Sequence, residues 1–166
     1  MDDITTEAGK KNLEKLETQP LISHLTQYFP TALDRVMRSS AINLYLYQLL
    51  EVLCHCISIS SYQILENVRK TNFFGCLIKL LLVHEQNNIL HKLIEKSFLH
   101  VFISDRMIYA EYKKHLLCEL DIIDCTAGHI ARLFPDEDML EKAKKKQYFG
   151  HFMRILKIYS GIETKD

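Results

Sequence analysis

Glycine and proline, the residues that interrupt helices most strongly, are scarce: the 166 residues include five glycines and three prolines. Patterns typical of strands are also weak. Helices joined by short connections are therefore the expected architecture. The glycines stand apart from one another, so the chain has no glycine-rich loop of the kind that holds nucleotide phosphates.

An excess of charge of one sign is missing too. Lys and Arg number 21 and Asp and Glu number 21, so the formal net charge is zero and no overall field favours nucleic acid or an anionic membrane. Every long apolar run is interrupted by Lys, His or Glu before it reaches bilayer length, and no basic-then-apolar leader follows Met1. We expect a protein of the cytoplasm, or also of the nucleus, with no nucleic-acid partner and no membrane insertion.

A disulfide framework is not expected either. The five cysteines, an odd number, fit reduced thiols on apolar helix faces. With 48% hydrophobic and 25% charged content, the chain is long enough to form one domain with a core. Residues 1–17 are mostly polar and predict an N-terminal tail, which leaves residues 18–166 as a single helical domain.

Residues 72–103 carry the clearest helical pattern. Residues 73–83 are apolar on nearly every side, which predicts a buried helix. Asn87 or Asn88 is placed to cap a second, two-faced helix. The apolar stripe of that second helix consists of Leu90, Ile94, Phe98 and Val101. The stretch therefore predicts an αα-hairpin.

Helical spacing of apolar residues continues on both sides of this hairpin. It predicts helices over residues 20–28, 31–37, 41–57, 62–68, 105–123, 124–134 and 148–159. Pro30 is expected to separate the first two, and the mixed charges of residues 136–146 are expected to be a solvated helix face. Because a hairpin cannot bury its own apolar surface, the predicted fold is all-α: an irregular helical-repeat, HEAT- or armadillo-like solenoid of stacked αα-hairpins.

Two short segments contain residue types that bind metals, but neither completes a site. His84 and Glu85 begin like the HExxH motif of zinc proteases, but Asn88 stands where the second histidine is required. Residues 54–56 read Cys-His-Cys, and consecutive helical residues point about 100° apart, so burial of the thiols is their expected role. The chain also has no nucleophile elbow. We therefore expect no metal, no cofactor, no catalytic residues and no enzymatic activity.

Four segments, in order along the chain, resemble one known family. Residues 71–74 read TNFF, which places an asparagine and two aromatic residues at the start of one helix. Residues 85–91 read EQNNILH, which is similar to a WNNxLH-type helix start but lacks the tryptophan. Residues 148–155 read YFGHFMRI, similar to a YMGHxxRI-like helix of the family. Gly150 in this segment is expected to allow close helix packing. Residues 116–134 resemble the pair of helices that precedes this motif in the family. These features resemble the SAPS domain family, the regulatory subunits that associate with the type 6 class of serine/threonine protein phosphatase.

The resemblance implies a non-catalytic scaffold that holds a phosphatase catalytic subunit of the type 6 class and directs it to substrates. A helical-repeat adaptor for another protein or peptide is the alternative. Polar groups on the outward turns of a solenoid are positioned for a partner, and helix capping is the other role open to such asparagines. The candidate partner-binding residues are Asn87, Asn88, His91, His151 and Arg154.

Overall fold

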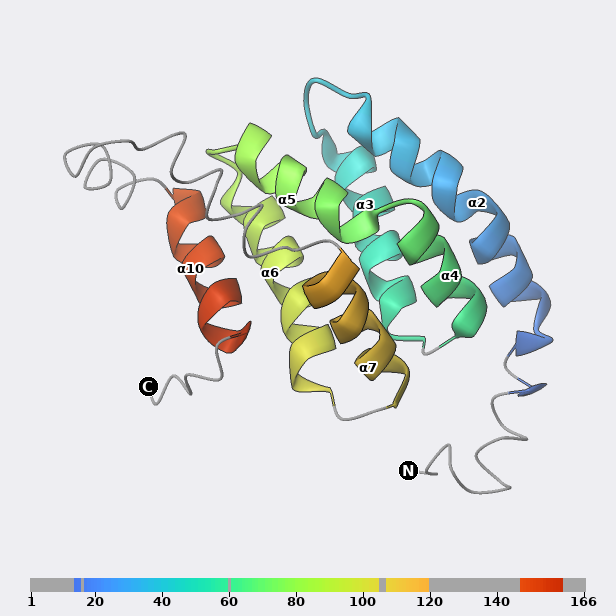
Figure 1. Cartoon of the computed structure of the whole chain (residues 1–166). Helices are drawn as coiled ribbons and strands as arrows, with labels where there is room; N and C mark the ends of the chain where they lie inside the picture. The colour runs from blue at the N-terminus through green and yellow to red at the C-terminus, as the bar shows by residue number, and fades with distance from the viewer. Residues whose placement is uncertain (1–13, 16, 60, 105–106, 120–146, 160–166) are drawn as a thin grey trace. The chain divides into compact units, whose positions relative to one another are not determined.

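The computed structural model of the chain describes residues 14–15, 17–59, 61–104, 107–119 and 147–159 (Figure 1). In these residues every regular element is helical, with seven α-helices, one π-helical turn and no strand. The elements are α2 (Pro20–Met37), α3 (Leu44–Ile57), α4 (Tyr62–Lys70), α5 (Phe73–Val83), α6 (Asn88–Ile103), α7 (Met107–Lys114), the π-helical turn η1 (His115–Glu119) and α10 (Gln147–Tyr159). The predicted all-α class is confirmed for this part of the chain.

The helices belong to two compact units. Unit 1 comprises Met1–Phe73 and Asp105–Tyr112, and unit 2 comprises Phe74–Ser104 and Lys113–Asp166. Helices α2, α3 and α4 and most of α7 lie in unit 1, whereas α6, α10 and nearly all of α5 lie in unit 2.

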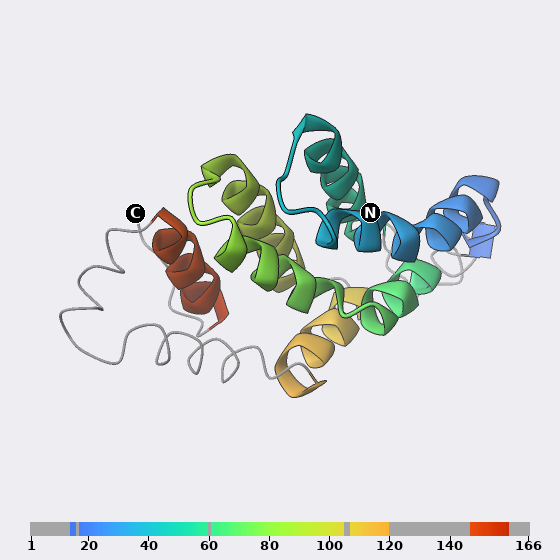
Figure 2. The same ribbon diagram turned by 90° about the horizontal axis from the view of Figure 1, so that it is seen from above.

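In unit 1, α2 packs against both α3 and α4 (Figure 2). Helix α2 begins at Pro20, whose fixed φ suits the first helical turn, as the sequence predicts. The buried face of α2 consists of Ile22, Phe29, Leu33 and Val36. The Phe29 ring meets the Phe73 ring edge-on, with ring centroids 5.2 Å apart, so aromatic packing contributes to this core.

The predicted break at Pro30 is wrong, because α2 runs through it without interruption. A proline has no N–H, so the carbonyl of Thr26, four residues earlier, loses its usual helical donor. The side-chain amide of Asn67 in α4 donates to that carbonyl instead, at 2.7 Å. A neighbouring helix thus supplies the missing hydrogen bond and lets two predicted short helices form one.

Helix α4 begins at a double cap. The Ser61 hydroxyl accepts from the Ile64 N–H at 3.3 Å and donates to the Glu17 carboxylate at 3.0 Å. The other Glu17 oxygen accepts from the Tyr62 N–H at 2.6 Å. A carboxylate is favoured at a helix N-terminus by the exposed amides and the helix dipole. Glu17, the last residue of the predicted tail, is therefore bound to α4.

Helix α3 buries its thiols as the sequence predicts. Cys54 and Cys56 are buried and form no disulfide among the described residues, whereas His55, between them, is exposed. Burial raises the pKa of the Cys56 thiol to about 11, so this group is a neutral thiol at physiological pH. The end of α3 is tied to α7 by the Tyr109 hydroxyl, which donates to the Ile57 carbonyl at 3.0 Å.

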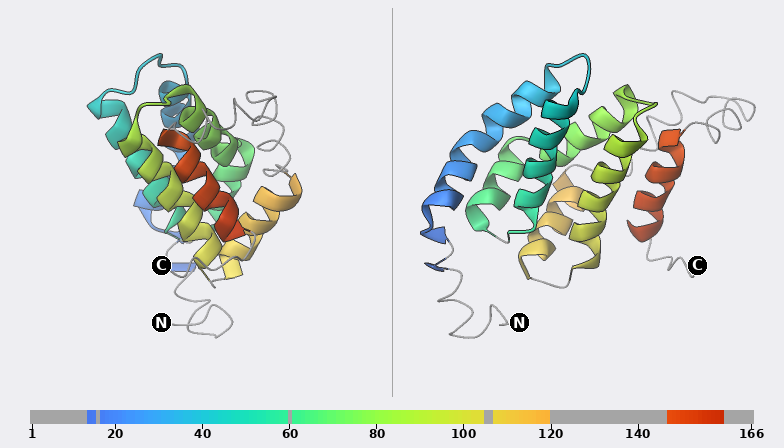
Figure 3. Two further views of the ribbon diagram at one scale, coloured as in Figure 1. Left: turned by 90° about the vertical axis from the view of Figure 1, so that its left-hand side faces the viewer. Right: turned by 180° about the vertical axis from the view of Figure 1, so that it is seen from behind.

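Unit 2 contains the predicted central hairpin, formed by α5 and α6. Asn87 is the N-cap of α6, and its side-chain oxygen accepts from the Leu90 N–H at 3.0 Å. The predicted stripe of Leu90, Ile94, Phe98 and Val101 is fully buried. The Phe98 ring lies 5.1 Å from that of Phe74 in α5, measured between centroids. Helix α10 lies beside α6 (Figure 3).

The helix predicted over residues 105–123 is confirmed where the chain is described: α7 ends at Lys114 and the π-helical turn η1 continues it to Glu119. Residues 105–106 and 120–123 lie outside the described residues. Tyr109, Tyr112 and Leu116, three of the apolar positions predicted to face inward, are buried. The predicted segments over residues 124–134 and 136–146 also lie outside the described residues. Among the helices that the structure describes, none combines the length and apolar character needed to cross a bilayer.

Candidate functional site

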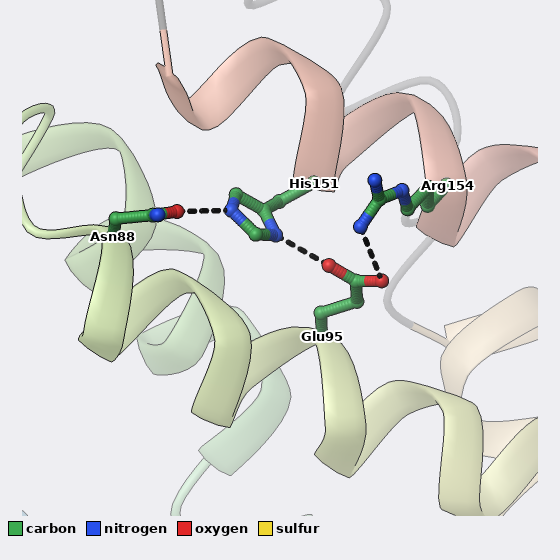
Figure 4. Close-up of polar contacts among 4 residues, drawn as sticks. All are labelled: Asn88, Glu95, His151 and Arg154. Atoms are coloured by element: carbon green, nitrogen blue, oxygen red, sulfur yellow. Dashed lines mark hydrogen bonds and ion pairs between the residues drawn. The ribbon is translucent and has the colours of Figure 1, made fainter.

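A cluster of polar side chains joins α6 to α10 within unit 2 (Figure 4). Asn88, His91 and Glu95 follow one another at intervals of three and four residues, so they share one face of α6. His151 and Arg154, one turn apart on α10, lie opposite them. We call Asn88, Glu95, His151 and Arg154 the α6–α10 cluster.

His151 is the centre of this cluster. Its Nδ1 bonds Glu95 Oε2, and its Nε2 lies 2.6 Å from Asn88 Oδ1. The other Glu95 oxygen accepts a hydrogen bond from Arg154 Nη1 at 3.4 Å. The side chains of His151 and Glu95 are only 8% and 10% exposed, whereas that of Arg154 is 63% exposed. The cluster therefore has a buried interior and one solvent-facing edge.

Both contacts of His151 are with acceptor oxygens, because Asn88 presents its amide oxygen and Glu95 its carboxylate. A neutral imidazole carries one N–H and can donate to only one of them, whereas an imidazolium donates to both. With the Asn88 amide in this orientation, an imidazolium satisfies both contacts by donation, whereas a neutral ring satisfies one. The Glu95 carboxylate faces both His151 and the guanidinium of Arg154.

His91 lies next to the His151 ring but has a different role. It is fully buried, and its Nε2 lies 2.9 Å from the His84 carbonyl, so that nitrogen carries the proton. Its ring centroid is 5.5 Å from that of His151, at an interplanar angle of 65°. Burial lowers the pKa of His91 more than the hydrogen bond to His84 raises it, and the neighbouring His151 lowers it further. The two imidazole rings therefore pack edge-on, and His91 is the one that burial keeps neutral.

The five candidate partner-binding residues come together around the start of α6. Asn87 caps the helix, Asn88 bonds His151, and His91 and His151 are buried. Asn88 and Arg154 are exposed, so of the five candidates these two are the best placed to contact a partner directly. That contact stays a prediction, because the geometry shows only the contacts within unit 2.

Two features of the cluster differ from what the sequence suggested. The sequence pattern does not single out Glu95, yet this residue is buried and bonds both His151 and Arg154. Its position seven residues after Asn88 was the available signal. Gly150 does not bring the described helices close together, because a Cβ built there meets no atom of the described residues within 4 Å.

The described residues contain no group of three or more His, Cys, Asp and Glu side chains placed to hold a metal ion. The ionisable groups of the cluster bond one another, which suits a role in holding α10 against α6.

Comparisons of the chain with known protein families, with curated proteins and with solved structures found no match. The segments over residues 85–91 and 148–155 meet in the α6–α10 cluster.

Proposed function

We propose that the chain is a non-catalytic, all-α scaffold subunit that binds the catalytic subunit of a type 6 class serine/threonine phosphatase and directs it to substrates. On this proposal its helix pairs stack as a HEAT- or armadillo-like solenoid, and the protein acts in the cytoplasm or the nucleus. Catalysis belongs entirely to the bound subunit.

One observation carries the proposal. The two segments with the most distinctive resemblance, residues 85–91 and 148–155, contribute Asn88 and His151, which bond across 63 positions of sequence. Chance matches in two separate segments would not be expected to meet in one cluster. The meeting of both motifs at a buried histidine supports a shared architectural role and, with it, kinship to a family of phosphatase scaffolds.

The cluster also supplies a physical reason for partner binding at this place. Glu95 and His151 fix α10 against α6, so Asn88 and Arg154 are held at defined positions near the surface. Groups that are already ordered lose less conformational entropy on binding than free side chains do. Arg154 is well suited to a partner's carboxylate or carbonyl, because its planar guanidinium carries several N–H donors.

The test is direct binding between purified proteins. The immobilised full chain is offered purified catalytic subunits of the type 6, type 2A and type 1 phosphatase classes, one at a time. We expect preferential retention of the type 6 subunit, with Arg154→Ala weakening binding about tenfold, which corresponds to about 1.4 kcal/mol. Arg38→Ala is the matched control, because Arg38 is an exposed arginine of unit 1 whose ion-pair partner among the described residues is Asp34 of α2.

A folded chain that retains none of the three subunits would contradict the proposal. The second candidate is a helical adaptor for another protein, favoured by Leu44 and Val52 on α3, which are 73% and 50% exposed although apolar. Exposed apolar residues on one helix mark a surface that a partner can cover. Capture from cell extract of a partner lost on Leu44→Ser/Val52→Ser, with no phosphatase subunit present, would favour this adaptor.

A further inference from the structure

The outer face of α6 carries a stripe that its packing does not explain. Ile89, Lys92, Lys96 and Ile103 are all exposed, and the two isoleucines are each 67% exposed. At about 100° of rotation per residue, the four positions lie within a sector of roughly 60°. We call these four residues the α6 stripe: two lysines between two apolar ends.

The two lysines lack counter-charges. Lys92 and Lys96 are four residues apart, where like charges on a helix repel each other, and neither has an ion-pair partner among the described side chains. The nearby Glu95 is turned inward, where it bonds His151 and Arg154. The stripe therefore keeps an unfavourable positive pair that an acidic partner would neutralise.

Two other exposed lysines of unit 2, at positions 79 and 114, lie outside the α6 stripe.

One end of the stripe reaches a shallow hollow. The turn between α5 and α6, residues 83–89, surrounds a surface hollow of about 790 Å³. Its apolar rim is formed by Val83 and Ile89, which are 62% and 67% exposed. The hollow can receive an apolar side chain of a partner whose acidic groups reach Lys92 and Lys96.

We propose that the α6 stripe is a docking surface for an acidic amphipathic helix of a partner protein. Ile89 and Ile103 are about 21 Å apart along α6, the length of four turns of a partner helix. Apolar side chains at both ends of that helix cover the two isoleucines, and carboxylates between them pair with the two lysines. The charges set recognition and the apolar ends supply buried area. This inference does not depend on the phosphatase, so failed phosphatase capture leaves it standing.

The test uses the full chain and a synthetic helical peptide of about 15 residues, with leucines at its ends and glutamates on the same face. Fluorescence anisotropy measures binding at low and high salt, with a peptide carrying lysines in place of the glutamates as the control. We expect binding of the acidic peptide only, weakened by salt. The double variant Lys92→Glu/Lys96→Glu should weaken binding by about tenfold or more, on the scale of two lost charge pairs.

The matched control is Lys79→Glu/Lys114→Glu, which changes the net charge equally at two exposed lysines of unit 2 outside the stripe. It should bind the acidic peptide nearly as well as the unchanged protein. Equal weakening by both double variants, or no binding by the folded chain, would overturn the proposal. Vesicles containing phosphatidylserine are the remaining probe. Binding to them without binding to the peptide would assign the stripe to a membrane surface and overturn the protein partner.

Discussion

Removing Glu95 tests the α6–α10 cluster most severely, because its carboxylate bonds both His151 and Arg154. Glu95→Ala leaves the His151 ring, 8% exposed, without its counter-charge. Breaking a buried ion pair by removing one partner costs about 3–5 kcal/mol. Because the Glu95 side chain keeps 10% exposure and Arg154 can turn to solvent, we expect the lower end, about 3 kcal/mol.

The same reasoning predicts a much smaller effect when both partners are replaced. In Glu95→Leu/His151→Leu no buried charge remains, and apolar replacement of a buried pair is often nearly neutral. The single variants should therefore each destabilise the protein more than the double variant does. Glu66→Ala is the surface control, because Glu66 pairs with Lys70 at 3.3 Å in an exposed position, where such pairs contribute at most about 1 kcal/mol.

Urea unfolding followed by circular dichroism measures these changes, and hydrogen exchange locates them. Loss of Glu95 should speed amide exchange in α10 more than in α2, because α10 packs on α6 and α2 belongs to unit 1. If Glu95→Ala costs no more than Glu66→Ala, or if the double variant is the least stable of the set, the buried ion pair is refuted.

Three further changes have expected outcomes. Asn67→Ala should cost about 1 kcal/mol by urea unfolding and less in a Pro30→Ala background, since residue 30 would then supply an N–H to the same carbonyl. The pKa of His91 in the folded protein lies below its ordinary value of 6.5. At pH values between the two, the histidine is protonated in the unfolded chain but not in the folded protein, so the free energy of unfolding falls as pH falls. His91→Gln should remove this contribution of His91 to the pH dependence of stability, which is at most about 1.4 kcal/mol per pH unit. Gly150→Ala should leave the free energy of unfolding unchanged or raise it by up to about 1 kcal/mol, the difference in helix propensity between Gly and Ala. A large loss of stability would show a hidden contact.

Local signals in the sequence predicted the helices well where local chemistry decides the outcome. Pro20 begins α2, and Ser61 and Asn87 cap α4 and α6 through their own side chains. Each of these depends on residues no more than three positions away, so the sequence pattern contains the whole interaction. Pro30 is different, because the donor that compensates for it is Asn67, on another helix.

The polar cluster shows the same division between local and distant interactions. Asn88, His151 and Arg154 were identified as candidates, but their arrangement depends on contacts between two helices that are far apart in sequence. Glu95 and His151 are separated by 56 positions. Its spacing from Asn88 and His91 places Glu95 on their face of α6, but its partner on α10 decides that it is buried.

The bond network centred on His151 is tested most directly by nitrogen NMR of the histidine rings in the full chain at neutral pH. The geometry predicts that both ring nitrogens of His151 carry protons that exchange slowly with water, one coupled to Glu95 and one to Asn88. His91 should show one proton only, on the nitrogen that faces the His84 carbonyl. A single, rapidly exchanging proton on His151 would contradict the network and remove the bond that joins residues 85–91 to residues 148–155.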